Sequence, residues 1–200
     1  MTKKSIIALC VILISCISNQ TSAQKLRFGD AAPQIKTFDV FGEEVHISKN
    51  NHSKALIGFM RYVGCPVCNF RTHELIENYD SIVASGYKII LIYESNSETL
   101  KKYLTETPVP FQVIADPKRK LYKKFGVQPS FWKTLKSAFN KKATKDKKKG
   151  NELFENNRPK RDGKLTGIPA DFLITEDGRI ERAYYGKNIS DHLPINEIIK

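Results

Sequence analysis

Cysteines and long apolar runs are scarce in this 200-residue sequence. It contains four cysteines, at positions 10, 16, 65 and 68, so a framework of several structural disulfides is excluded. No stretch after residue 23 stays apolar over the roughly 20 residues that a membrane-spanning helix needs. A protein built from membrane-spanning helices is therefore excluded as well.

Metal-ligand patterns are lacking too. A structural zinc site takes about four ligands, usually from two pairs. The sequence has a single CxxC pair, and its four histidines show no ligand spacing. We therefore expect no metal, and no cofactor other than a redox-active disulfide between Cys65 and Cys68.

Positive charge, by contrast, is abundant and concentrated in one segment. The chain has a formal net charge of +12 and an ordinary apolar content of 40%. Residues 133–164 contain twelve Lys and Arg and four Asp and Glu, a net charge of +8. Such a segment could attract acidic partners or an anionic membrane surface. The simpler interpretation, a solvated loop, is the one we take, and we expect no nucleic-acid partner.

The N-terminus has the composition of a secretory signal peptide. Lys3 and Lys4 precede a short apolar run at residues 6–14, and small residues at Thr21-Ser22-Ala23 suit cleavage before Gln24. This pattern predicts a signal peptide over residues 1–23 and a mature domain over residues 24–200. The run is too short to span a bilayer.

A second cleavage site competes with the first. Leu13-Ile14-Ser15-Cys16 resembles a bacterial lipobox, in which Cys16 would carry lipid and tether the protein to a membrane. Both alternatives predict an exported protein, either periplasmic, anchored as a lipoprotein, or secreted. Paired thiols in an exported protein are often structural, but a disulfide across two intervening residues closes too small a loop to stabilise much.

Strands and helices alternate along the mature chain. This order predicts an α/β fold with a central, mainly parallel sheet and helices on both faces. The expected elements are a hairpin around Gly42, strands at 55–61, 88–93 and 111–115, helices at about 66–85, 97–105 and 116–125, a terminal hairpin at 171–185 and a helix from about Ser190. A basic insert at about 129–166 interrupts the pattern. Its lysine-rich part, 141–150, is expected to be solvated and mobile, with Trp132 and Phe139 anchoring the insert near the active site.

The Cys65-Pro66-Val67-Cys68 motif lies where the first buried strand ends and a helix begins. A helix N-terminus offers free N–H groups and a partial positive charge, which favour thiolate over thiol. If the motif behaves as it does in thioredoxins, Cys65 is expected to be the more exposed thiol that attacks, and Cys68 the thiol that resolves. Arg61 and Arg71 flank the motif and could lower a thiol pKa further, although each alone is also explained as a charged rim residue.

Several segments together resemble the peroxiredoxins of the alkyl hydroperoxide reductase and thiol-specific antioxidant family. The resemblance covers about residues 28–128 and 165–188, and implies a thioredoxin-like fold with an N-terminal hairpin extension. The matching motifs are Gly29-Asp30-Ala31-Ala32-Pro33, Asp39-Val40-Phe41-Gly42, Ile114-Ala115-Asp116-Pro117, Phe125-Gly126-Val127, Phe172-Leu173-Ile174 and Asp177-Gly178-Arg179-Ile180.

The active-site motif departs from that family. True peroxiredoxins have Pro-x-x-x-Thr/Ser-x-x-Cys, but counting back from Cys65 gives Gly58 and Tyr62, and counting back from Cys68 gives Arg61 and Cys65. Neither alignment supplies the proline or the hydroxyl. The best resemblance is to peroxiredoxin-like proteins with a thioredoxin-type CxxC, in which the second cysteine aligns with the peroxide-reactive one.

The family's arginine before its penultimate strand is also missing. Gly167-Ile168-Pro169 stands there instead and resembles the cis-proline segment of thioredoxins, which binds extended substrates. Ile168 and Pro169 are therefore the predicted substrate-binding residues. An ordinary trans proline that opens a strand is the alternative.

These observations predict an exported thiol–disulfide oxidoreductase with antioxidant-type chemistry at Cys65 and Cys68. Its expected partners are protein or small-molecule disulfides, with hydroperoxides as an alternative, and an unidentified thiol reductant. One competing hypothesis is a thiol peroxidase that reacts through Cys68. The other is a non-catalytic thioredoxin-fold binding module whose CxxC forms a merely local disulfide.

Overall fold

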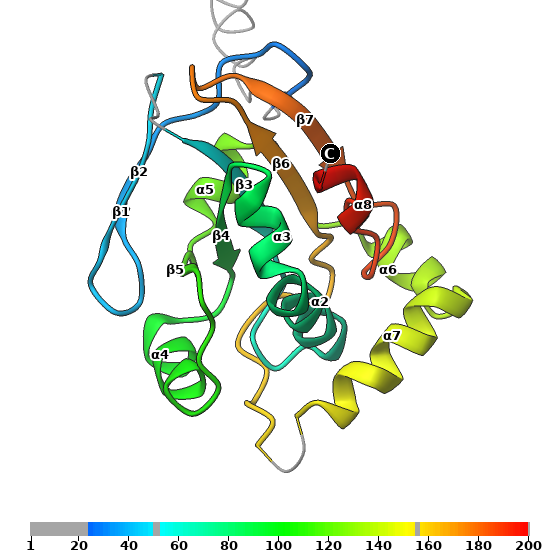
Figure 1. Ribbon diagram of the computed structural model, residues 1–200. Coiled ribbons are helices and arrows are strands. Elements are labelled where there is room, and N and C mark those ends of the chain that lie inside the picture. The colour runs from blue at the N-terminus through cyan, green and yellow to red at the C-terminus, as the bar shows by residue number, and fades with distance from the viewer. Residues whose placement is uncertain (1–23, 50–52, 155–156, 200) are drawn as a thin grey trace, which may run out of the picture.

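A five-stranded sheet in the order β5-β4-β3-β6-β7 lies at the centre of the protein (Figure 1). The computed structural model describes residues 24–49, 53–154 and 157–199. The predicted signal segment, with Cys16, lies outside the described residues. The strands are β1 Ile35–Phe38, β2 Glu44–Ile47, β3 Lys54–Phe59, β4 Tyr87–Tyr93, β5 Gln112–Ala115, β6 Ala170–Ile174 and β7 Ile180–Tyr185.

Helices follow most strands, as the alternating sequence pattern predicts, and the α/β prediction is confirmed. The described helices are α2 Pro66–Glu77, α3 Tyr79–Ala84, α4 Ser97–Glu106, α5 Lys120–Lys124, α6 Phe131–Ser137, α7 Lys141–Glu152 and α8 Ile195–Ile198. Within the described part of the chain, no helix has the length and apolarity needed to cross a bilayer.

The sheet is parallel in one half and antiparallel in the other. β3, β4 and β5 run parallel, while β6 runs antiparallel to β3 and pairs with β7 as the predicted hairpin. Antiparallel pairing is therefore not confined to the β6–β7 hairpin, because it also joins β6 to β3. The turn of that hairpin contains Gly178 at a φ of +72°, which glycine adopts without steric cost.

Each face of the sheet carries its own core. The face with Leu56 and Leu91 packs against α2, α3, α4 and α8. The opposite face, with Ile57 and Phe59, packs against α5 and against the β1–β2 hairpin that extends the fold at its N-terminus. β3 and β4 are buried on both faces, which explains their nearly continuous apolar sequences.

The helices start or end differently from the sequence expectation in three places. The predicted helix over 66–85 is two helices, because Asn78 leaves helical geometry and its side chain bonds the Glu74 carbonyl at 2.8 Å. α5 begins after Arg119, although Asp116 still caps it by accepting from the Lys120 and Leu121 N–H groups. α8 has a single turn and starts later than expected.

The lysine-rich segment differs most from its prediction. Residues 141–150, expected to be solvated and mobile, lie within the helix α7 (Lys141–Glu152), which packs beside α2 (Figure 1). Its buried face consists of Ala143, Asp146 and Gly150, which recur at helical spacing and are small enough for close packing. Trp132 and Phe139 do not anchor the insert, since they are 70% and 86% exposed. Phe154, which is 3% exposed, packs into the core instead.

Candidate active site

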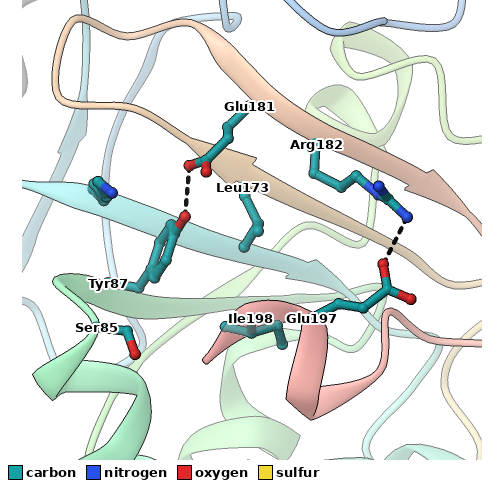
Figure 2. A pocket seen from close by; sticks show the side chains of 8 residues that line it. Ser85, Tyr87, Leu173, Glu181, Arg182, Glu197 and Ile198 are labelled. Atoms are coloured by element: carbon teal, nitrogen blue, oxygen red, sulfur yellow. Dashed lines mark hydrogen bonds and ion pairs between the residues drawn. The ribbon is translucent and has the colours of Figure 1, made fainter. Parts of the chain in front are cut away.

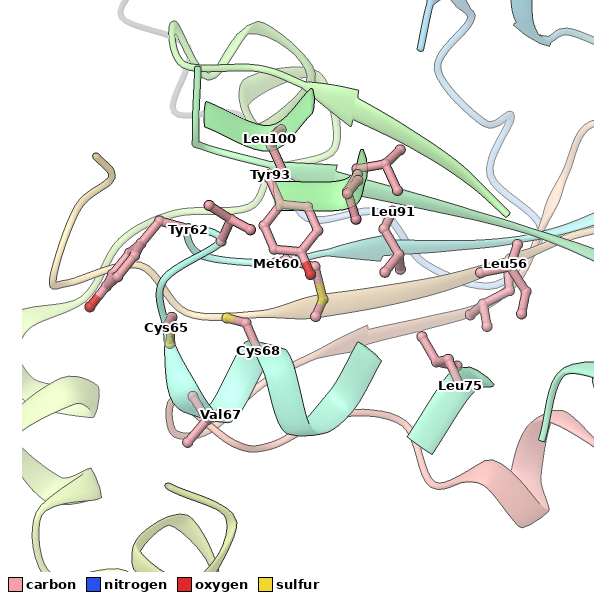
Figure 3. Packing of buried hydrophobic residues seen from close by; sticks show 14 of the residues in the cluster. Leu56, Met60, Tyr62, Cys65, Val67, Cys68, Leu75, Leu91, Tyr93 and Leu100 are labelled. Atoms are coloured by element: carbon pink, nitrogen blue, oxygen red, sulfur yellow. The ribbon is translucent and has the colours of Figure 1, made fainter. Parts of the chain in front are cut away.

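The CxxC motif lies at the carboxyl end of β3 and at the N-terminus of α2. The Met60 N–H still bonds to the Ile92 carbonyl, and the chain then turns through residues 61–64 into the helix. Cys65 is the N-cap residue, with extended dihedral angles, and Pro66 occupies the first helical turn, where no N–H partner is needed. Figure 3 shows Cys68 on the side of α2 that faces the sheet and Cys65 at the N-terminal end of this helix.

Both thiols are free and buried, at 1% exposure for Cys65 and 0% for Cys68. The expectation that Cys65 would be the more exposed thiol is therefore wrong for this conformation. Arg61 contacts both sulfur atoms. Its Nη1 donates to Cys65 Sγ at 3.1 Å, and its backbone N–H donates to Cys68 Sγ at 3.3 Å.

These contacts separate the acidities of the two thiols. Burial alone would raise the pKa of Cys65, but the thiol hydrogen bond from Cys68, the Arg61 charge and the N–H groups of Cys68 and Val67 lower that pKa to about 6. Burial, the hydrogen bond to Cys65 and the charge on Cys65 hold the pKa of Cys68 well above its ordinary value. At neutral pH the pair therefore contains one thiolate, on Cys65, and one thiol.

Arg61 and Arg71 have different surroundings, and neither is the solvent-facing rim residue considered above. Arg61 is 4% exposed and lies on the thiols. Arg71 is 3% exposed, but it bonds the Leu193 carbonyl at 2.8 Å and pairs with Glu74. Its charge helps to lower the pKa of Asp171 rather than that of a cysteine.

Buried hydrogen bonds fix the chain on both sides of the cysteines. The Tyr122 hydroxyl donates to the Met60 and Ile92 carbonyls, at 2.6 and 2.8 Å, where the chain leaves the sheet. Thr72 Oγ1 lies 3.0 Å from the Cys68 carbonyl and 2.7 Å from the Tyr93 hydroxyl. Each of these polar groups is buried and partnered, as a rigid site requires.

The insert forms a roof over the motif. The Gly64 carbonyl accepts from Arg158 Nε at 2.9 Å, and the Leu165 carbonyl accepts from Arg61 Nη2 at 2.5 Å. Asn69 Nδ2 donates to the Gly150 carbonyl at 3.2 Å. The contact between α7 and α2 is so close that a Cβ added at Gly150 would lie 1.8 Å from the Pro66 carbonyl oxygen. We refer to α7 and residues 157–167 as the roof.

Ile168 and Pro169 also lie beside the motif, just before β6. Phe59 at the end of β3 pairs with Ala170, which places Pro169 next to the chain that leads to the cysteines. No peptide bond among the described residues is cis, so the cis-proline interpretation is wrong and the trans alternative holds. The Pro169 carbonyl accepts from the Gly186 N–H at 3.0 Å, and both predicted substrate-binding residues are buried.

Two cavities beside the sheet are lined by neither cysteine. A cavity of about 150 Å³, shown in Figure 2, lies near Lys54 and Tyr87, at the amino ends of the parallel strands and thus opposite the thiols. A second cavity, of about 160 Å³, lies between α2 and α4 and is lined by Thr72 and Tyr93 among others. In the described ranges, no cluster of three His, Cys, Asp or Glu side chains could hold a metal ion.

Sequence reasoning missed the roof contacts for a simple reason. The Gly64, Gly150 and Leu165 carbonyls act through backbone atoms, which have no signature in a single sequence. The helical spacing of Ala143, Asp146 and Gly150 was the only available signal. Composition concealed it, since lysines surround these three positions.

A CxxC between a central strand and a helix, in an α/β sheet of this order, defines a thioredoxin-fold thiol oxidoreductase. Comparison with known sequences gives the family. The sequence model of the AhpC/TSA family matches residues 28–183, so the chain belongs to that family. The predicted thioredoxin-like, peroxiredoxin-type fold is thereby confirmed.

Individual relatives are distant. The chain is 29% identical over 114 residues to the thioredoxin-like protein AAED1, chloroplastic, of Arabidopsis thaliana, a match that covers 56% of this chain and 46% of that protein. It is 24% identical over 102 residues to the peroxiredoxin Bcp of Escherichia coli (strain K12), covering 51% and 65%. The matches thus span less than two thirds of either relative.

Solved structures agree on the fold. A thiol peroxidase from Chromobacterium violaceum superimposes with a TM-score of 0.59 at 16% identity, covering 88% of this chain and 86% of that one. A peroxiredoxin-like protein from Aquifex aeolicus gives 0.59 at 15% identity, covering 88% and 85%. At these identities the likeness concerns the fold alone.

Proposed function

We propose that this protein is an exported thiol–disulfide oxidoreductase in which Cys65 attacks and Cys68 resolves. The observation that carries the proposal is the Arg61 guanidinium, 3.1 Å from Cys65 Sγ, beside a thiol whose pKa is lowered to about 6. The neighbouring Cys68 stays protonated because its pKa is raised. One activated nucleophile next to one protonated thiol is the arrangement that a dithiol exchange catalyst uses.

The exchange proceeds in two balanced steps. The Cys65 thiolate attacks one sulfur of a substrate disulfide, forms a mixed disulfide and releases the other sulfur as a thiolate, which takes a proton from solvent. Cys68 then loses its proton and attacks Cys65 Sγ, which forms the Cys65–Cys68 disulfide and expels the second substrate thiolate. A thiol reductant of unidentified nature restores the dithiol. No cofactor is part of this scheme.

Hydroperoxide reduction is the second candidate, and the burial of the thiols favours it. With both cysteines at 1% exposure or less under the roof, a small oxidant reaches them more easily than a protein disulfide does. The Cys65 thiolate would attack the terminal oxygen and break the O–O bond, giving a sulfenic acid and an alkoxide or hydroxide that takes a proton from solvent. Cys68 would then condense with the sulfenic acid, releasing water. The raised pKa of Cys68 argues against the alternative in which Cys68 reacts first.

Export and substrate contacts complete the proposal. Residues 1–23, with or without lipidation at Cys16, would deliver the protein to the periplasm, to a membrane or outside the cell. Ile168 and Pro169 would contact an extended substrate once the roof opens, because they flank the end of β3 beside the motif.

Two single variants test the assignment of roles. Cys68→Ser is expected to accumulate a mixed disulfide through Cys65 with a small disulfide substrate, whereas Cys65→Ser is expected to form none. With hydrogen peroxide, loss of the first oxidation step only in Cys65→Ser would support the same order. Peroxide reactivity lost only in Cys68→Ser would contradict it and favour the peroxidase that reacts through Cys68.

The reduction potential of the pair tests the proposal as a whole. A reversible couple within roughly −120 to −270 mV, the range of known redox catalysts, supports catalysis. A disulfide below about −300 mV would indicate a structural link and favour the non-catalytic binding module.

A further inference from the structure

Helix α6 presents its apolar side chains to solvent, while Lys133 and Ser137 face the protein. Phe131 is 61% exposed, Trp132 70% and Leu135 46%, and Phe139, just after the helix, is 86% exposed. Phe131 and Leu135 are four residues apart and therefore lie on one side of the helix. A surface helix normally buries such a stripe, so this orientation is inverted.

The inverted orientation is held by polar contacts on the other side. Ser137 is 3% exposed, and its hydroxyl accepts from the Ile189 N–H at 3.1 Å. Lys133 Nζ donates to the Gly186 carbonyl at 2.8 Å. The Ser130 N–H, at the N-cap, donates to the Thr166 carbonyl at 2.8 Å. The apolar side chains therefore face outward because the helix is docked through its polar face.

Exposed lysines line the next helix, α7, whose one exposed carboxylate is Glu152 at its C-terminal end. α7 presents six exposed lysines, and Lys141, Lys145 and Lys148 share one side of it. The one acidic residue between Phe131 and Asn151 is Asp146, which is 5% exposed and bonded to Lys142 and Ser190. The exposed charged side chains of α6 and α7 are thus cationic, with the single exception of Glu152 at the end of α7.

We propose that this surface docks on an anionic lipid bilayer. We call it the α6–α7 surface, and it consists of Phe131, Trp132, Leu135, Phe139, Lys141, Lys145 and Lys148. Trp, Phe and Leu side chains insert at the boundary between headgroups and acyl chains, while lysines bind anionic headgroups. A cluster of exposed aromatic residues this large is costly in water, and interfacial insertion removes that cost.

The charge pattern favours lipid over a protein partner. An apolar cluster alone would suit either occupant. Six exposed lysines along one helix, with flexible stems and a single exposed carboxylate at its end, match a diffuse anionic surface better than a shaped protein epitope. Docking would place the roof of the active site against the membrane.

Trp132 makes the test direct, because it is the only tryptophan of the chain. We would record its emission with vesicles of phosphatidylglycerol and phosphatidylcholine, with vesicles of phosphatidylcholine alone, and with brominated acyl chains as quenchers. The whole chain is used throughout, so the apolar N-terminus is common to every sample. A blue shift and quenching that depend on phosphatidylglycerol are expected.

Matched variants distinguish binding through the α6–α7 surface from non-specific binding to vesicles. Charge reversal on α7 is expected to weaken the Trp132 response by more than about tenfold, while the control reversals leave it unchanged. Phe131→Ser with Phe139→Ser is expected to reduce the shift, while Phe28→Ser with Phe38→Ser, also at exposed positions, is not. The charge variants are Lys141→Glu, Lys145→Glu and Lys148→Glu, and their controls are Lys101→Glu, Lys118→Glu and Lys120→Glu.

Three results would overturn the proposal. One is emission that does not change with either vesicle. Another is an equal response in the α7 variant and its control. The third is a concentration-dependent shift without lipid that Phe139→Ser abolishes, which would assign the surface to a second copy of the chain. Near-ultraviolet circular dichroism verifies that each variant is folded.

Discussion

Arg61 joins Cys65 to the roof of the site. One guanidinium nitrogen donates to Cys65 Sγ at 3.1 Å, and the other donates to the Leu165 carbonyl at 2.5 Å. The charge that stabilises the thiolate is therefore also a contact that holds residues 157–167 over it. Because oxidation of Cys65 removes the thiolate, it also removes the electrostatic reason for Arg61 to stay in this position.

Replacing Arg61 should make Cys65 less acidic. In Arg61→Met the pKa of Cys65 is expected to rise from about 6 toward its ordinary value of about 8.5, since the nearest positive charge is lost while burial remains. Arg61→Lys keeps the positive charge but loses the two separate donors of the guanidinium. The pKa of Cys65 in this variant should lie between the values of the parent protein and Arg61→Met. Thiolate absorbance at 240 nm against pH measures this without needing reagent access. Lys36→Met, at an exposed position, is the control, and an unchanged titration in Arg61→Met would contradict the assignment.

The stability of the reduced protein should depend on pH through the same pair. Cys65 has a pKa of about 6 in the folded state, below the ordinary value of about 8.5. Its contribution to stability is therefore complete above about pH 8.5 and is lost as the pH falls through about 6. Cys68 has a raised pKa in the folded state, so its contribution to stability is complete below about pH 8.5 and is lost at higher pH. The free energy of unfolding should therefore rise by up to about 1.4 kcal/mol per pH unit between 6 and 8.5, then fall.

Denaturant unfolding under reducing conditions at a series of pH values measures this curve. Cys65→Ser is expected to abolish the rise, and Cys68→Ser to abolish the fall above pH 8.5. A curve with the same rise in Cys65→Ser would show that another group is responsible.

The Tyr122 hydroxyl should contribute to stability more than a typical hydrogen bond. It is buried and donates to two carbonyls, those of Met60 and Ile92. Tyr122→Phe removes this donor from the Met60 carbonyl, whereas the Ile92 carbonyl keeps the Met60 N–H, and the loss should cost about 1–3 kcal/mol of unfolding free energy. Tyr79→Phe, at a half-buried ring packed on Phe111, is the control and should cost much less. Equal losses in both variants would assign the effect to the ring rather than to the hydroxyl.

The order of elements and the place of the CxxC could be predicted because local patterns determine them. The continuous apolar residues of β3 and β4 mark buried strands, and the Asp177-Gly178 turn marks the hairpin. Cys65 follows from its position between a strand and a helix. These features need only neighbours in the sequence.

The burial of the site could not be predicted, because it depends on contacts distant in sequence. Arg61 meets Leu165 across 104 residues and Gly64 meets Arg158 across 94. Composition indicated a mobile loop around Gly150, since lysines imply solvent. The helix forms nonetheless, because its lysines remain in solvent while its buried residues, Ala143, Asp146 and Gly150, fit against α2.

Opening the roof should expose the thiols, and Gly150 is the position that tests this. In Gly150→Val the new side chain cannot fit against the Pro66 carbonyl oxygen, 1.8 Å from its Cβ, so α7 must move away from α2. If docking loses about 1.4 kcal/mol, the open population rises about tenfold. Reaction of the reduced protein with the bulky disulfide 5,5′-dithiobis(2-nitrobenzoate) should accelerate by a similar factor, while reaction with hydrogen peroxide should change far less.

The comparison between reagents separates opening from unfolding. Lys147→Val places the same β-branched side chain on the exposed side of α7, so any effect of that side chain on the helix itself is present without the clash. It should leave both rates unchanged. A general loss of structure in Gly150→Val would accelerate both reagents and lower the unfolding midpoint, whereas roof opening accelerates only the large one. Equal rates in Gly150→Val and the parent protein, with the fold intact, would mean that disulfides reach Cys65 by a path that α7 does not cover.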